Sequence, residues 1–445
     1  MRSLTRPGLA RSASYQFKNV TVALARNMST EAVATSPGSA VCHLPTSMPA
    51  SAAPNPSLSG TVVKVQKGNM PPGFRATVGN FDTFELPQHV TGCAGDVAMG
   101  RAIIQAWRRD GILQFTMTPE QKRLRDAAFS ASKRFFKLPY QEKARCVDDQ
   151  SYAGYIASGE EITDGVADYS EIFTVTKDLP LEDQRVQAGW PCHGPCPWPT
   201  RIGMKNAMKA YMDELARCGE VLLGLTEAGL GLEPGALTKY TADGWHHSRV
   251  LRFPARHQTN GKGKEGRGIG SHTDYGLLVI SAQDNVGGLF VRPPYQGEDY
   301  ANWKSSAAGM KENDEGWVYV PPQDDCFTVI LGDMMQYLTN SFLKSTPHKV
   351  GLNNAERYTI AYFHEPNFQA VVKPIEDFSN GDQSVSFHED AEQDNGVHYG
   401  THFTNMFMRN YPDRITTKRL IEENRYPLLA TKELCTMDAN RVEEL

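Results

Sequence analysis

Several features that mark whole classes of protein are missing from this 445-residue sequence. No apolar run approaches the roughly 18 residues that a membrane-spanning helix needs. Lys and Arg total 46 against 51 Asp and Glu, and no basic segment is interleaved with aromatic residues, so nothing favours nucleic-acid binding. The eight cysteines include no C-x-x-C pair, which argues against a disulfide framework. We therefore expect an intracellular protein with neither a nucleic acid nor a membrane as partner.

Acidic residues are missing from residues 1–30, which hold five Lys and Arg residues among Ser, Ala and Leu; Glu31 is the first acid. This composition is typical of a mitochondrial transit peptide. An unstructured tail is the alternative, with Met28 as a later start that would remove the signal. The expected location is therefore mitochondrial or cytoplasmic. Residues 31–80 are rich in Ser, Pro, Ala and Thr and are expected to be a disordered linker.

The rest of the sequence predicts one domain over residues 81–430, followed by a C-terminal tail over 431–445. Apolar spacing and helix-end residues predict four helical regions: Asp96–Asp110 with Asp96 as N-cap, Pro119–Lys137 with Thr118 as cap, Thr200–Leu230 as one helix or two, and Pro412–Asn424. The stretch from about 245 to 375 is mostly strand and turn. The expected fold is mainly β with flanking helices around a jelly-roll core, also called a double-stranded β-helix.

The most informative residues are His272 and Asp274, followed by His348. A strand projects alternate residues to one face, so His272 and Asp274 are expected to point the same way. Pro347 favours an extended chain just before His348. Two imidazoles and one carboxylate form the facial triad that holds Fe(II) in non-haem oxygenases and leaves positions open for O2 and a co-substrate.

Arg357 lies nine residues after His348 and begins a segment whose composition is typical of a strand. A guanidinium binds a carboxylate through paired hydrogen bonds at fixed geometry. Arg357 is therefore a candidate for the distal carboxylate of 2-oxoglutarate, and a structural arginine is the alternative. His398 and His402 have the i, i+4 spacing of a helical zinc site, but Tyr399 and Gly400 argue against a helix there.

Longer segments carry a resemblance to the Fe(II)/2-oxoglutarate-dependent oxygenases, and within them to the ethylene-forming branch. The resemblance runs from about Phe84 to about Asn424. Its segments are Tyr155–Glu161, Ala188–Pro195, Asp243–His247, Val250–Pro254, Gly268–Ile280, Tyr362–Phe368 and His402–Arg409.

The resemblance implies Fe(II) at His272, Asp274 and His348, with 2-oxoglutarate held by Arg357. It also implies that ethylene and CO2 form from 2-oxoglutarate and O2 beside bound L-arginine. Arginine hydroxylation, which yields guanidine and pyrroline-5-carboxylate, is the competing reaction. The positions that match the family's arginine contacts are Glu161, Thr163, Tyr275 and Arg409, and Arg249 matches an arginine close to the metal and 2-oxoglutarate.

Two departures from the ethylene-forming pattern concern the co-substrate pocket. Ile330 and Leu331 stand where that branch has Phe-Pro, and Thr359 stands where it has Ala. Thr359 is a further candidate ligand of the 2-oxoglutarate carboxylate, because a Ser commonly fills that role in the wider family. The departures support an alternative, an ordinary 2-oxoglutarate-dependent hydroxylase of arginine or another small molecule. A jelly-roll binding or sensing module without catalysis is the third reading.

Overall fold

The computed structural model describes residues 70–74, 76–200, 202–259, 266–294, 314–376 and 396–425. The expected transit peptide and C-terminal tail lie outside these residues, as does the linker up to residue 69. Strand β1 (Thr77–Val78) pairs in parallel with β12 (Val318–Tyr319). Ordered structure therefore begins ahead of Phe81, in the last part of the segment expected to be disordered.

Two β-sheets form the core of the described residues. The larger sheet has the strand order β2-β3-β13-β10-β15-β8-β7-β4, and the smaller one β1-β12-β11-β14-β9. The bounds are β2 Thr83–Phe84, β3 Ile112–Thr116, β4 Gly154–Ile156, β7 Glu171–Val175, β8 His247–Phe253, β9 Arg267–His272, β10 Leu278–Gln283, β11 Leu289–Val291, β13 Cys326–Leu331, β14 His348–Gly351 and β15 Arg357–His364. Two short ribbons add β5 (Ile162–Thr163) with β6 (Val166–Ala167), and β16 (Val371–Val372) with β17 (Val397–His398). This is the predicted jelly roll.

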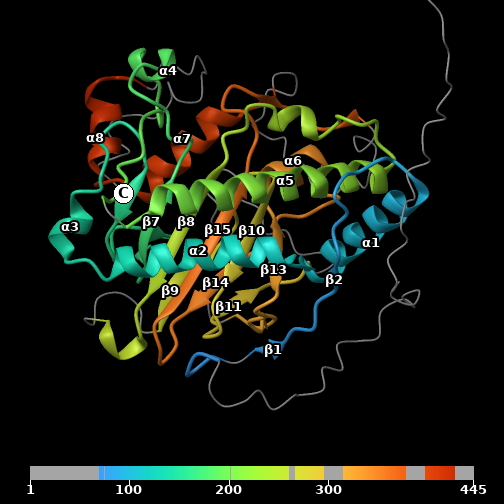
Figure 1. Cartoon of the computed structure of the whole chain (residues 1–445). Coiled ribbons are helices and arrows are strands. Elements are labelled where there is room, and N and C mark those ends of the chain that lie inside the picture. The colour runs from blue at the N-terminus through green and yellow to red at the C-terminus, as the bar shows by residue number, and fades with distance from the viewer. Residues whose placement is uncertain are drawn as a thin grey trace, which may run out of the picture. The chain divides into compact units, whose positions relative to one another are not determined.

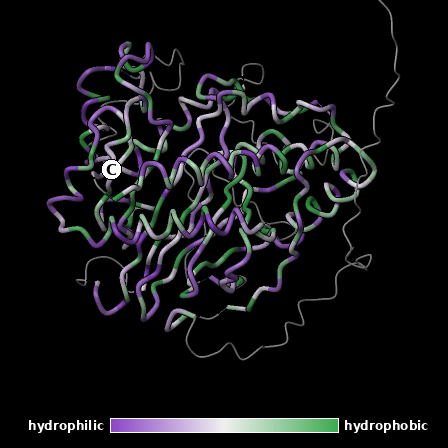
Figure 2. Tube along the Cα trace, in the orientation of Figure 1, coloured by the Kyte–Doolittle hydropathy of each residue, from purple (hydrophilic) through white to green (hydrophobic). Residues whose placement is uncertain are grey.

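Helices cover one face of the larger sheet, where α2 (Pro119–Phe136) and α5 (Met204–Leu230) cross its central strands (Figure 1). Hydrophobic and hydrophilic residues alternate along both helices, as expected of helices with one buried side (Figure 2). The first helix, α1 (Ala94–Asp110), packs against α5. A Cβ on Gly100 would lie 2.0 Å from the Leu225 carbonyl oxygen, so glycine is needed where these two helices meet.

The remaining helices are short or lie near the C-terminal end of the domain. They are α3 Tyr140–Ala144, α4 Gln184–Gln187, α6 Asp333–Leu338, α7 Tyr399–Asn410, α8 Ile415–Glu422, and two 3-10 turns at Thr238–Thr241 and Arg256–Gln258.

The helix predictions are confirmed in outline and corrected in two places. The Thr118 cap of α2 is confirmed, because its hydroxyl accepts from the Gln121 N–H at 3.2 Å. Asp96 is not the N-cap of α1. It is the third helical residue and accepts from the backbone N–H of Thr91 and Cys93. The expectation of no helix at Tyr399 is wrong, because α7 begins there.

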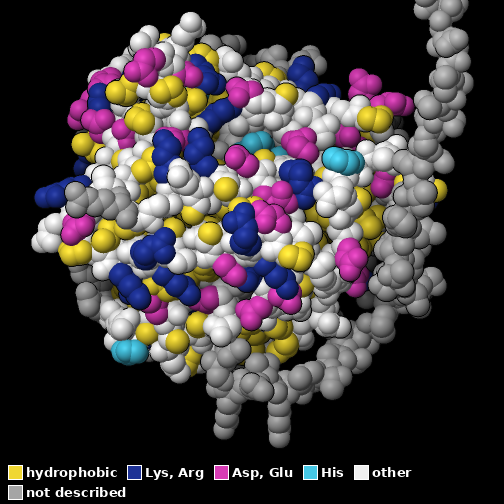
Figure 3. Space-filling model, in the orientation of Figure 1, with side chains coloured by type: hydrophobic (Ala, Val, Ile, Leu, Met, Phe, Trp, Pro, Cys, Tyr) yellow, Lys and Arg dark blue, Asp and Glu magenta, His cyan; other side chains and the backbone are white. Residues whose placement is uncertain are grey.

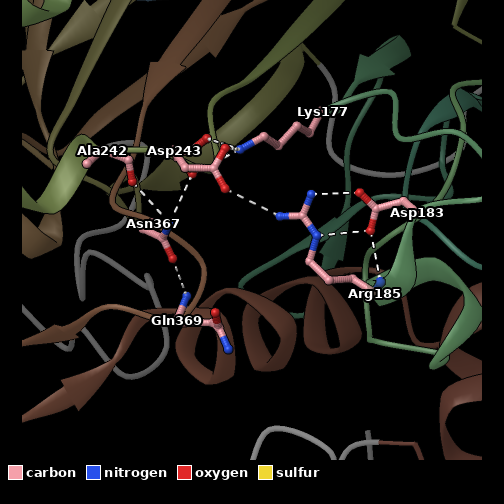
Figure 4. A network of polar contacts seen from close by, with 8 residues as sticks. Lys177, Asp183, Arg185, Ala242, Asp243, Asn367 and Gln369 are labelled. Atoms are coloured by element: carbon pink, nitrogen blue, oxygen red, sulfur yellow. Dashed lines mark hydrogen bonds and ion pairs between the residues drawn. The ribbon is translucent and has the colours of Figure 1, made fainter. Parts of the chain in front are cut away.

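The loop before β8 is fixed by a polar network (Figure 4). Asp243 forms ion pairs with Lys177 and with Arg185, and Asp183 holds the other side of the Arg185 guanidinium. The Asn367 amide donates to the Asp243 carbonyl at 3.2 Å. These contacts tie the chain entering β8 to the chain leaving β15, so both central strands of the larger sheet are fixed at the same end.

The surface seen in Figure 3 intersperses Lys and Arg with Asp and Glu, so that face has no broad area of one charge. None of the helices in the described ranges is long and apolar enough to span a bilayer. Cys93 is disulfide-bonded, which the sequence analysis did not predict, and five other described cysteines are free and buried.

Candidate active site

His272, Asp274 and His348 converge at one point, with one candidate ligand atom from each within 4.8 Å of the others. His348 in β14 pairs directly with His272 at the end of β9. The Asp274 carboxylate lies 3.7 Å from His272 Nε2 and 3.4 Å from His348 Nε2. Asp274 lies in the connection between β9 and β10, so the expectation that it shares a strand with His272 is wrong, although the two side chains do meet.

Backbone carbonyl groups orient both imidazoles. His272 Nδ1 lies 2.8 Å from the Gly270 carbonyl oxygen, and His348 Nδ1 lies 3.0 Å from that of Thr346. A carbonyl oxygen only accepts, so each Nδ1 donates its proton and each Nε2 presents its lone pair to the shared point. Burial lowers the pKa of His272 to about 3, which keeps it neutral and ready to bind a metal. The donor set therefore fits Fe(II).

Arg357 begins β15 and is almost fully buried, at 2% exposed. Its Nη2 donates to the side-chain oxygen of Gln283 at 3.1 Å, and its Cζ lies 4.9 Å from the centre of the Phe253 ring. Its Nε and Nη1 have no hydrogen-bond partner among the described residues. Burial lowers its pKa to about 10, so the guanidinium remains charged at neutral pH. A buried cation with unused donors is suited to a carboxylate ligand.

One cavity joins the triad to Arg357. It encloses about 610 Å³, a volume that includes its open mouth, and lies between the two sheets. Its lining comprises Arg249, Leu251, Phe253, Ile269, His272, Asp274, Val279, Ser281, Gln283, Leu289, Ile330, His348, Val350, Arg357, Thr359, Ala361 and Phe363. We call it the triad cavity. The buried Thr359 hydroxyl has no partner in the described part of the chain. Thr359 and Ile330, two of the departures from the ethylene-forming pattern, thus lie on the cavity wall.

A second group of polar side chains adjoins this cavity, and we call Glu161, Arg249 and Tyr411 the Glu161 cluster. Arg249 Nη2 lies 2.6 Å from Glu161 Oε1 and 2.9 Å from the Tyr411 hydroxyl, which itself donates to Glu161 Oε1 at 2.7 Å. Glu161 is 3% exposed, and its Oε2 has no partner among the described residues. Arg249 therefore connects a buried carboxylate to the triad cavity.

The other three residues that match arginine contacts are placed differently. Tyr275 follows Asp274 directly and packs against the aromatic rings of α7. Arg409 lies in the last turn of α7, close enough to Tyr275 for an electrostatic interaction. The Thr163 hydroxyl donates to Asp168 at 2.5 Å, so its proton is already committed. None of the three lines the triad cavity.

Two site residues at the end of α7 were not predicted from the sequence. Asn410 donates from its side-chain amide to the Tyr275 hydroxyl at 2.6 Å, and Tyr411 completes the Glu161 cluster. Asn410 follows Arg409 directly, and Tyr411 comes next. Their position next to Arg409 could have indicated them, because consecutive residues at the end of a helix lie close together even though their side chains point in different directions.

Two buried carboxyl groups behind the triad were also missed. Burial raises the pKa of Asp333 and of Glu365 to about 8. The Asp333 N–H donates to the Asp274 carbonyl at 2.7 Å, and its carboxyl group accepts from the Ser345 hydroxyl at 2.7 Å. Asp333 therefore supports the segment that carries Asp274.

A second group with donors close enough for a metal comprises Glu220, His246 and His364. The two imidazoles stack with only 10° between their planes, and His246 Nδ1 accepts from the Glu365 N–H at 3.0 Å. Glu220 accepts from His364 Nε2 at 3.0 Å. Parallel rings cannot both aim a lone pair at one ion, so this group is a hydrogen-bonded cluster in the described structure. His402 of α7 is buried and does not join a ligand set with His398.

Comparisons with known proteins agree with this geometry. The family model described as 2OG-Fe(II) oxygenase superfamily matches residues 245–366, and the one described as non-haem dioxygenase in morphine synthesis N-terminal matches residues 87–201. The chain is 49% identical over 353 residues to the 2-oxoglutarate-dependent ethylene/succinate-forming enzyme of Ralstonia nicotianae. The aligned region covers 78% of this chain and 97% of that protein.

More distant relatives include a homoarginine-6-hydroxylase of Glycine max, 31% identical over 302 residues, covering 63% of this chain and 80% of that protein. Among solved structures, a full-length Neurospora crassa protein in complex with alpha-KG and thymine has a TM-score of 0.57 at 21% identity, covering 74% of this chain and 97% of that one. That likeness supports the jelly-roll fold. The chain belongs to the 2OG-Fe(II) oxygenase superfamily, and is an enzyme that uses Fe(II), 2-oxoglutarate and O2.

Proposed function

We propose that this oxygenase converts 2-oxoglutarate and O2 to ethylene and CO2 with L-arginine bound beside the metal. Arginine hydroxylation, followed by breakdown to guanidine and pyrroline-5-carboxylate, is the competing reaction. The name of the Ralstonia nicotianae relative supports the first reaction, and the named substrate of the Glycine max relative is a guanidino amino acid. The observation that carries the arginine assignment is the buried Glu161 carboxylate with one oxygen unused.

His272, Asp274 and His348 would hold Fe(II), which supplies the binding and activation of O2 when present. Arg357 would hold the distal carboxylate of 2-oxoglutarate through its unused Nε and Nη1 donors. The Thr359 hydroxyl is available for the same carboxylate. Arg249, which also lines the triad cavity, would supply positive charge near the other end of the co-substrate. The apolar wall of the cavity would exclude water around the keto acid.

Glu161 would take the arginine guanidinium, because an unused carboxylate oxygen in a buried site strongly favours a charged donor. Arg249 already occupies Oε1, so the ligand would bind at Oε2 or displace Arg249. Tyr275 and Arg409 would face the amino-acid end of the substrate. Thr163 has its hydroxyl proton committed to Asp168, which leaves its oxygen lone pairs or its backbone for a ligand contact.

Ordinary hydroxylation without ethylene is the second candidate, and one observation favours it. Ile330 and Thr359, which differ from the ethylene-forming pattern, both line the triad cavity where the co-substrate would bind. A changed wall alters how the keto acid lies against the metal, and therefore the ratio of products.

Headspace gas chromatography of Fe(II)-loaded protein tests the proposal. Incubation with 2-oxoglutarate and O2 is expected to yield ethylene that depends on iron and rises with added L-arginine. Succinate formed in equal amount with hydroxylated arginine, without ethylene, would select the second candidate. Folded, iron-loaded protein that consumes no 2-oxoglutarate would reject both.

A further inference from the structure

The hydroxyl group of Tyr275 is held by a side chain that does not line the triad cavity. The Asn410 side-chain amide lies at the end of α7 and donates to the Tyr275 oxygen at 2.6 Å. The two residues are 135 positions apart in the sequence, and both are partly buried. Within the described ranges, this is the hydrogen bond that fixes the hydroxyl.

The direction of this bond determines what Tyr275 can offer to a ligand. A phenol oxygen that accepts an amide N–H still has its own O–H to donate. No acceptor for that proton occurs among the described residues. A phenol keeps its proton at neutral pH, so this O–H is available to a ligand. Tyr275 is thereby set as a donor and matches an anionic or carbonyl group better than a second N–H.

The neighbouring cation indicates which group that is. Arg409 immediately precedes Asn410 and interacts electrostatically with Tyr275. Glu161 also interacts electrostatically with Tyr275 and supplies negative charge there. A molecule with a guanidinium at one end and a carboxylate at the other would match both charges, and a plain guanidinium would match only one.

We infer that Asn410 is a positioning residue that sets the Tyr275 hydroxyl as a hydrogen-bond donor to the α-carboxylate of the substrate, and so selects amino acids over amines that carry the same guanidinium. The inference rests on the proposed function, because it takes a guanidino amino acid as the substrate. It adds a selectivity role to a residue outside the metal and co-substrate machinery.

The test measures binding of L-arginine and of agmatine, which lacks the carboxylate, to protein loaded with Fe(II) and 2-oxoglutarate without O2. Asn410→Leu is expected to weaken arginine binding about tenfold, the effect of losing a hydrogen bond to a charged group. Agmatine binding is expected to change less than about twofold, since no carboxylate is present. Asn206→Leu, an exposed change on α5, is the matched control and should leave both affinities as in the natural chain.

Two further variants guard against a purely structural effect. Asn410→Asp keeps the size but presents an acceptor, so it draws the Tyr275 proton to itself and repels a carboxylate. It is expected to weaken arginine more than Asn410→Leu does. In a Tyr275→Phe background, Asn410→Leu should weaken arginine binding by less than about a further twofold, because the hydroxyl that Asn410 positions is already absent.

The outcomes separate this inference from the proposed function. Equal losses for arginine and agmatine, or losses that add in the double variant, would overturn the role of Asn410 while arginine remained the substrate. If the natural protein binds neither compound, and Glu161→Gln changes nothing, the arginine assignment itself fails.

Discussion

The triad cavity and the Glu161 cluster lie side by side and are built in opposite ways. In the cavity, polar groups are fixed by the backbone or by neutral side chains and still have unused bonding capacity, as in His272, His348 and Arg357. In the cluster, Glu161 and Arg249 neutralise each other, and Tyr411 bridges them. The cavity lies between paired strands, whereas Glu161 stands just ahead of a two-residue strand in a short ribbon.

This difference teaches how each ligand would be bound. A ligand that enters the triad cavity gains contacts without breaking any, because the unused donors are already in place. A cation that approaches Glu161 meets a carboxylate that already has a positive partner. Binding there depends on the one unused oxygen or on exchange of Arg249, so we expect weaker affinity and sharper selectivity in the cluster.

The largest expected effect comes from removing a triad carboxylate. Asp274→Ala leaves the triad with two imidazoles and no carboxylate, so iron binding should fall by more than about 100-fold and turnover with it. Iron per chain after anaerobic loading, with 2-oxoglutarate consumption, measures both. Undiminished iron content would show that the three side chains do not hold the metal.

Replacing Arg357 should weaken the binding of 2-oxoglutarate without weakening the binding of iron. Arg357→Ala is expected to raise the KM for 2-oxoglutarate by about 100-fold, since two charged hydrogen bonds are lost, and Arg357→Lys by about tenfold. Iron binding should match the natural protein, because the guanidinium contacts the organic acid and not the metal. A loss of iron binding as large as the loss of 2-oxoglutarate binding would contradict the assignment of Arg357 to the co-substrate.

The cluster is tested by Glu161→Gln, which keeps the shape and removes the charge. We expect arginine binding to weaken by about tenfold or more, whereas slow turnover of 2-oxoglutarate without arginine persists. Consumption of 2-oxoglutarate against arginine concentration gives both values. A response to arginine equal to that of the natural protein would remove Glu161 from the binding site.

The smallest expected effect compares two buried glutamates. Glu161 has Arg249 beside it, whereas Glu365 has no cationic partner among the described residues, since burial lowers the pKa of nearby His247 to about 3. Burial raises the pKa of Glu365 to about 8. The protonated Glu365 carboxyl group therefore stabilises the fold fully at pH values below the ordinary pKa of a glutamate. This stabilisation is lost as the pH rises through 8.

Glu365→Gln removes this dependence. Relative to the variant, the natural protein should lose roughly 2 °C or more of melting temperature between pH 6 and pH 9. Melting curves of the metal-free proteins across that range provide the measurement. A constant difference between the two proteins would mean that Glu365 does not hold a proton in the folded state.

The sequence predicted the parts of the site that depend on local spacing. The spacing of His272 and Asp274, and Pro347 before His348, were enough to name the three residues as candidates, although the strand expected to hold both His272 and Asp274 ends at His272. The end of the strand before Asp274 was not predicted, because the Asp274 carbonyl accepts from the N–H of Asp333, which is 59 positions away. The family resemblance, and not spacing, supplied Glu161 and Arg249.

Helix α7 shows why the rest was missed. Tyr399 and Gly400 disfavour a helix by local propensity, yet the helix begins there. A Cβ on Gly400 would lie 2.4 Å from the Phe368 carbonyl oxygen, so the glycine serves close packing and does not end the helix. Without α7, the positions of Asn410 and Tyr411 could not be inferred, because their partners lie in distant segments.

The reliance of His272 and His348 on main-chain oxygens has a wider consequence. In many metal centres an acidic side chain tunes the basicity of the ligand, and a single codon change can retune it. Peptide oxygens carry no titratable proton and are the same whatever residue occupies the position. Evolution could therefore vary the pocket walls, and with them the choice of product, while the electronic character of these two proposed metal ligands stayed constant.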